Sequence, residues 1–105
     1  MAADKVLLNH VMDLLAPLDG ISDRAMFGGF GIFHEGDMFA LITNSGLHFK
    51  VNETNLGAYQ EAGSKQFKPM PYYEVPADCL DDRTMLLEWA KISIAIGHAT
   101  AKKKR

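Results

Sequence analysis

The sequence predicts a small two-layer α+β domain, in which an antiparallel sheet packs against helices. The chain has 105 residues, of which 48% are hydrophobic, and this suits one domain with a single modest core. Helix-spaced apolar residues occur at both ends, and the region between them is rich in aromatic and branched residues. The connections within that region are too short for crossover helices, so its strands should pair antiparallel.

The first segment is predicted to be a helix. Asp4 is the expected N-cap, and Pro17 and Gly20 end the segment, because proline lacks a donor and glycine tolerates positive φ. Apolar residues recur there at three- and four-residue spacing: Leu7, Val11, Leu14, Leu15 and Leu18.

Three strands are predicted next, over residues 26–34, 38–43 and 47–51. Turn residues separate them at 35–37 and 44–46, so they should form an antiparallel meander. The third strand alternates apolar and polar residues. One of its faces is therefore expected in the core and the other wet or thinly covered.

A short middle helix and a short strand should follow. Residues 54–62 have helical spacing of apolar side chains, and Gly63 stops that helix. Residues 72–75 read as a strand at or near a sheet edge, because Pro76 ends it.

The last element is predicted to be a long helix that begins near Asp81 and Asp82, either of which can cap it. Gly97 should weaken it towards its end, and one domain is expected over residues 1–101. The remaining residues are expected to form a disordered basic tail: Lys102, Lys103, Lys104 and Arg105.

Charge limits the partners that the chain can bind. The formal net charge is −2, and without the four basic tail residues 7 basic and 13 acidic residues remain, which gives −6. A body this acidic repels a phosphate backbone, so nucleic-acid binding is expected only weakly, through the tail.

The glycine cluster at 28, 29 and 31 resembles a phosphate-binding loop only superficially. Such loops lead from a strand into a helix N-terminus, whereas another strand is predicted after Gly31. A twisted or bulged strand, or close packing of another element against the backbone, is the favoured interpretation.

No residue set forms a recognisable reaction centre or metal site. The four histidines lack metal-ligand spacing, although His34 and His48 lie on strands that could share a face. Cys79 is expected to pack as a small hydrophobe. The chain is therefore predicted to be no enzyme and to hold no cofactor. The alternative, a small-ligand site or enzyme, would need a pocket that gathers Arg24, Glu74 and a histidine.

The sequence also predicts a cytoplasmic location without membrane contact. Its N-terminus lacks the pattern of a signal peptide, and no apolar stretch approaches the ~20 residues that span a bilayer. The lone cysteine suits a reducing compartment.

The chain resembles the N-terminal domain of the TfoX/Sxy family over nearly its whole length. The segment Arg24-Ala25-Met26-Phe27-Gly28-Gly29-Phe30-Gly31-Ile32-Phe33 carries the densest part of the resemblance. Matching segments follow in order at 36–42, 47–51, 62–67, 72–76 and 80–90.

The resemblance implies a two-layer fold and a bacterial regulator of competence and transcription, with no catalytic residues. The expected activity is therefore binding of a protein, either the transcription machinery or a second copy of this chain. The residues predicted to carry the contact are Arg24, Met26, Phe27, Gly28 and Gly29. A nucleic-acid accessory protein that uses the basic tail is the second hypothesis.

Overall fold

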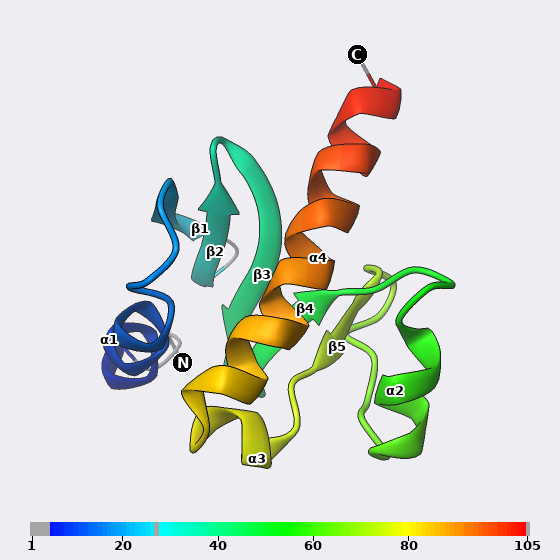
Figure 1. The fold of residues 1–105 in the computed structure, drawn as a ribbon, viewed down its shortest axis with the longest axis horizontal. Helices are drawn as coiled ribbons and strands as arrows, with labels where there is room; N and C mark the ends of the chain where they lie inside the picture. The colour runs from blue at the N-terminus through cyan, green and yellow to red at the C-terminus, as the bar shows by residue number, and fades with distance from the viewer. Residues whose placement is uncertain (1–4, 27, 105) are drawn as a thin grey trace.

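A computed structural model describes residues 5–26 and 28–104, and it has the predicted α+β architecture (Figure 1). A five-stranded sheet forms one layer and helices form the other. The elements run in the order α1 (Lys5–Leu14), β1 (Ile21–Met26), β2 (Gly29–His34), β3 (Asp37–Thr43), β4 (Gly46–Lys50), α2 (Leu56–Glu61), β5 (Tyr72–Glu74), α3 (Ala77–Leu80) and α4 (Arg83–Lys104).

The sheet is an antiparallel meander in which every strand lies beside its neighbour in sequence, from β1 to β5. The prediction of one strand over 26–34 is wrong, because Met26 and Gly29 are paired ends of the separate strands β1 and β2. Pattern alone missed β1 since it is an edge strand. Its four central residues, 22–25, are exposed, so no apolar alternation marks it.

Gly29 and Gly31 let backbone and side chains approach closely, as predicted, and a strand, not a helix, follows the glycine cluster. Gly28 has φ 72° in the turn between β1 and β2. A Cβ on Gly29 would overlap the carbonyl oxygen of Ile42 on β3. A Cβ on Gly31 would lie 2.9 Å from the sulfur atoms of both Met26 and Met38.

The helices share one core on one face of the sheet. Side chains from α1, α2 and α4, among them Val11, Tyr59 and Leu86, join Ile32 and Phe49 of the sheet in a single buried cluster. α4 runs across the sheet in front of β3 (Figure 1). At the crossing, a Cβ on Gly97 would lie 2.7 Å from the carbonyl oxygen of Met38. Gly97 is thus a close-packing residue, not only a weak point of the helix.

The opposite face of the sheet is covered in part by the segment before β5. Phe67 packs against His48 with ring centroids 5.4 Å apart, and His48 is only 2% exposed. The outward face of β4 is therefore covered at His48, where the sequence predicts a wet or thinly covered surface.

The C-terminal helix starts where predicted. The Met85 amide donates to Asp82 Oδ1 at 3.2 Å, so Asp82 provides the cap. The short helix α3 before it was not predicted, and α4 continues to Lys104, beyond the expected end near Ala101. Asp4, the predicted cap of α1, lies outside the described residues. Over the part of the chain that the structure describes, no helix has the length and apolarity needed to cross a membrane.

Candidate functional site

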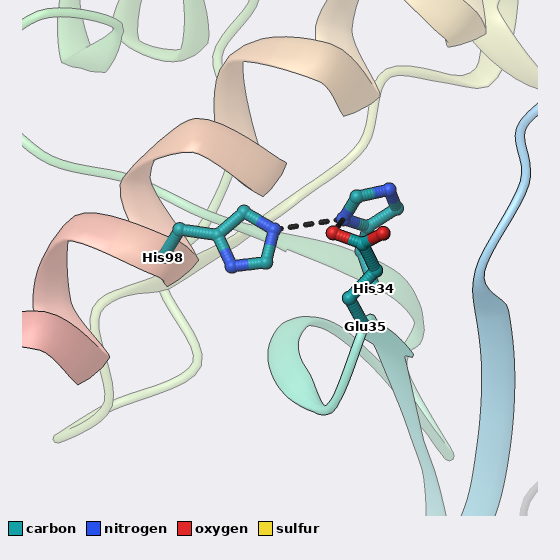
Figure 2. Close-up of side chains that lie close together, drawn as sticks. All are labelled: His34, Glu35 and His98. Carbon is teal, nitrogen blue, oxygen red and sulfur yellow. Dashed lines mark hydrogen bonds and ion pairs between the residues drawn. The ribbon is translucent and has the colours of Figure 1, made fainter.

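Two histidines from distant parts of the chain meet at the end of the β2–β3 hairpin. His34 is the last residue of β2, and His98 lies near the end of α4. The two side chains point towards each other, with the carboxylate of Glu35 beside them (Figure 2). His34 Nδ1 lies 2.7 Å from His98 Nε2, and His98 Nδ1 lies 2.7 Å from Asp37 Oδ2.

The local fold explains why these groups meet. His34 and Asp37 are opposite each other across the hairpin turn, so both side chains lie on the face that α4 covers. Gly97 lets α4 approach β3 closely, and this brings His98 down to Asp37. The Asp37 side chain is 14% exposed, against 22% for His34 and 36% for His98.

With both imidazoles neutral, the hydrogen bonds set the direction of the protons. A carboxylate oxygen accepts, so His98 Nδ1 donates to Asp37 and His98 Nε2 presents its lone pair to His34. His34 Nδ1 must then be the donor in the contact between the rings. One proton on His34 therefore lies between the two imidazoles, and Asp37 orients the second ring.

Two imidazoles and one carboxylate form a hydrogen-bonded chain in this cluster, and no nucleophile among the described residues joins it. In residues 5–26 and 28–103, no serine, threonine or cysteine side chain hydrogen-bonds to either imidazole. Nucleophilic catalysis needs such a pair within hydrogen-bond reach.

Sequence patterns missed this cluster because its histidines are 64 residues apart. Asp37 carried only a turn signal, in Glu35-Gly36-Asp37. His34 and His48 do not share a face of the sheet, so the shared face that the sequence left open is not formed. Strand alternation places His48 on the opposite face, where its Nδ1 donates to the Gly46 carbonyl at 3.1 Å. Burial lowers the pKa of His48.

The residues predicted to contact a partner cluster at one sheet edge. Arg24 and Met26 lie on β1, Gly28 is in the following turn and Gly29 begins β2. Phe27 lies outside the described residues. The Arg24 guanidinium lies over the Phe33 ring, 5.0 Å from its centroid, and the Arg24 side chain is exposed.

The basic residues at the C-terminus are partly described. Lys102 and Lys103 are exposed on the last turns of α4. Lys104 belongs to the helix, but its side chain lies outside the described part, as does all of Arg105.

Cys79 packs as predicted. It is fully buried in the core cluster, and burial raises the pKa of its thiol to about 11, with Asp78 and Asp82 adding to the effect. Such a thiol is no nucleophile near neutral pH.

The alternative pocket of Arg24, Glu74 and a histidine does not form. Arg24 is on β1 and Glu74 on β5, at opposite edges of the sheet. Four strand spacings separate them, about 19 Å. They therefore cannot share a hydrogen-bonded site.

Comparison with known proteins gives the family of this fold. The model of the TfoX N-terminal domain family matches residues 13–96, which is most of the chain. The chain belongs to this family. It is also 31% identical over 62 residues to the DNA transformation protein TfoX1 of Aliivibrio fischeri, a match over 59% of this chain and 30% of the relative. The match thus spans less than a third of that relative's length.

Proposed function

We propose that this TfoX N-terminal domain is a non-enzymatic regulatory module that binds an extended segment of a partner protein along the open edge of β1. The name of its relative, a DNA transformation protein, supports a role for this regulation in DNA transformation. The observation that carries the proposal is the exposed edge strand β1, which holds Arg24 and Met26 of the family signature.

The two edges of the sheet differ. At β5, the Phe67 amide donates to the Tyr72 carbonyl at 2.8 Å and the Glu74 amide donates to the Lys65 carbonyl at 2.9 Å. The segment before β5 thus covers that edge. β1 pairs only with β2 among the strands of the described sheet. An uncovered edge is a template for an added strand.

The register shows which backbone groups of β1 are available. Met26 and Gly29 flank a two-residue turn, so they form a hydrogen-bonded pair. Hydrogen-bonded pairs alternate along an antiparallel ladder, so Arg24 and Ser22 also bond to β2. The Glu35 amide donates to the Gly20 carbonyl at 2.9 Å, which continues this alternation. Asp23 and Ala25 therefore turn their N–H and C=O groups outward from the sheet.

The favoured occupant of this edge is a different protein, not a second copy. Paired residues of an antiparallel pair lie on the same face of the sheet, so in a symmetric dimer they are both odd-numbered or both even-numbered. One residue at the centre of the pairing then lies opposite its own copy. The two longest registers of β1 with itself would place Asp23 opposite its own copy or Arg24 opposite its own copy. Like charges directly opposite are destabilising.

Arg24 gives the chemistry expected of the partner. Its guanidinium is stacked on Phe33, and arginine binds carboxylates with paired donors. An extended segment with an acidic residue opposite Arg24 would therefore combine backbone hydrogen bonds with a cross-strand ion pair.

Two substitutions at one position test the mode of binding. Ala25→Pro removes an outward amide but no β1–β2 hydrogen bond, while Ala25→Val keeps the amide and favours a strand. In pull-downs from native cell lysate treated with nuclease, Ala25→Pro should lower partner recovery by about tenfold or more, and Ala25→Val should leave it unchanged.

The same pull-down separates the alternatives. Equal recovery by Ala25→Pro and Ala25→Val would contradict strand addition. Recovery of nuclease-sensitive material alone would contradict the protein partner and favour binding through Lys102 and Lys103. A control variant, Arg24→Ala, should weaken recovery less than Ala25→Pro, because it keeps all backbone groups of the edge.

A further inference from the structure

The histidine cluster has the ligand set of a transition-metal site. His34, Glu35 and His98 each offer one ligand atom, and these three atoms lie within 4.8 Å of one another. His34 Nδ1 is 2.7 Å from His98 Nε2 and 3.9 Å from Glu35 Oε1. The two rings and the carboxylate come together from the hairpin and from α4 (Figure 2). Two imidazoles and one carboxylate are the ligands of many zinc sites that keep an open position.

A metal ion would bind between the two ring nitrogens, where the shared proton now lies. When both rings are neutral, one proton lies between His34 Nδ1 and His98 Nε2, so exchange of that proton for a divalent cation leaves both nitrogens as ligands. Tetrahedral zinc with N ligands near 2.0–2.1 Å needs a separation of about 3.3 Å between the nitrogens. The observed separation is 2.7 Å, so small rotations of two half-buried side chains suffice.

The supporting shell is already in place. Histidines that bind metals usually donate their other N–H to a carboxylate, which fixes the ring and raises its basicity. His98 does this, with Nδ1 at 2.7 Å from Asp37 Oδ2.

The backbone holds Glu35 beside the rings in an uncommon conformation. Its φ is 48° and that of Gly36 is 89°, as in a hairpin turn that prefers asparagine, aspartate or glycine at the first position. A Cβ on Gly20 would lie 2.9 Å from Glu35 Cγ, so glycine at 20 leaves room for the glutamate stem.

We propose that His34, Glu35 and His98 bind one divalent transition metal ion of the zinc class, with Asp37 orienting His98. Nitrogen ligands disfavour Mg²⁺ and Ca²⁺, which prefer oxygen. The bound ion clamps the end of α4 to the β2–β3 hairpin. Its fourth position is open to water or to a side chain of a partner. The site involves none of the β1 residues of the proposed interaction, so the two proposals stand or fall separately.

Titration of the full, untagged chain with ZnCl₂ tests the site. Isothermal titration calorimetry should give one Zn²⁺ per chain. His98→Gln should weaken binding by more than the ~100-fold upper limit typical of outer-shell changes, and Asp37→Asn should weaken it by about 10–100-fold. His10→Gln is the matched control, because His10 is exposed on α1 and bonds to the Leu80 carbonyl instead.

Two further readouts separate metal binding from a structural role. Co²⁺ should give the visible absorption of a four- or five-coordinate site in the wild type and in His10→Gln, but not in His98→Gln. Zn²⁺ should raise the melting temperature of the same two proteins and leave that of His98→Gln unchanged. If His98→Gln does not fold, Glu35→Gln replaces it, since that side chain is 71% exposed.

The proposal has clear contrary results. It is wrong if the wild type takes up no Zn²⁺, or if His98→Gln and Glu35→Gln bind Zn²⁺ as tightly as His10→Gln does.

Discussion

Gly97 sets how closely α4 approaches the sheet, and its replacement by alanine should show this. In a free helix, Gly→Ala stabilises by about 1 kcal/mol. Here the new Cβ would lie 2.7 Å from the Met38 carbonyl oxygen, and a backbone atom cannot turn aside as a side chain would. Overpacking of this kind costs about 1–3 kcal/mol, and about 2–3 kcal/mol is expected where the neighbour is rigid. The gain in helix propensity offsets about 1 kcal/mol of this cost. Gly97→Ala should therefore lower the free energy of unfolding by about 1–2 kcal/mol.

Gly57 offers the matched control, because it lies in α2 and a Cβ there would meet nothing within 4 Å. Gly57→Ala should raise stability by up to ~1 kcal/mol. Urea unfolding followed by circular dichroism gives both values from the shift in midpoint at constant slope.

A Gly97→Ala protein as stable as the wild type, or more stable, would refute the packing argument. It would also remove the reason given for the approach of His98 to Asp37. A lower stability for both alanine variants would contradict the assignment of Gly57 as an unhindered helical position.

Three more predictions concern stability and reactivity. Because burial lowers the pKa of His48, the unfolded chain binds its proton first, and stability should fall as pH drops below about 6.5. In His48→Gln this fall should be smaller, and an unchanged pH profile of urea midpoints would contradict it. The buried thiol of Cys79 should resist Ellman's reagent at pH 8 in the folded protein and react in denaturant, whereas fast labelling of the folded protein would show that the thiol is accessible. Asp82→Ala should lower the free energy of unfolding by about 0.5–2 kcal/mol through loss of the bond to Met85, while Asp81→Ala should change it by less than ~0.5 kcal/mol. Equal losses in urea unfolding would contradict the assignment of the cap.

The predictions from sequence succeeded where the signal is local. Apolar periodicity located α1 and α4, and turn residues separated β3 from its neighbours. The acidic pair Asp81 and Asp82 predicted a cap for α4, and the structure shows that Asp82 provides it. Capping and periodicity depend on residues within one or two helical turns of each other, so both can be recognised in the sequence.

β1 shows where local pattern fails. An edge strand with residues 22–25 exposed buries little, so it needs no alternation of apolar and polar residues. Its strand conformation comes from hydrogen bonds to β2, which the sequence does not display.

The family and the α+β class could be recognised from the sequence, because both depend on the order of short segments along the chain. Only the tertiary structure decided which side chains meet. His34 and His98 come together because α4 crosses the end of the hairpin at Gly97. The same assembly buries His48 beneath Phe67 and leaves the β1 edge open. Contacts between residues more than 60 positions apart depend on the packing of whole elements, and no spacing within the chain encodes them.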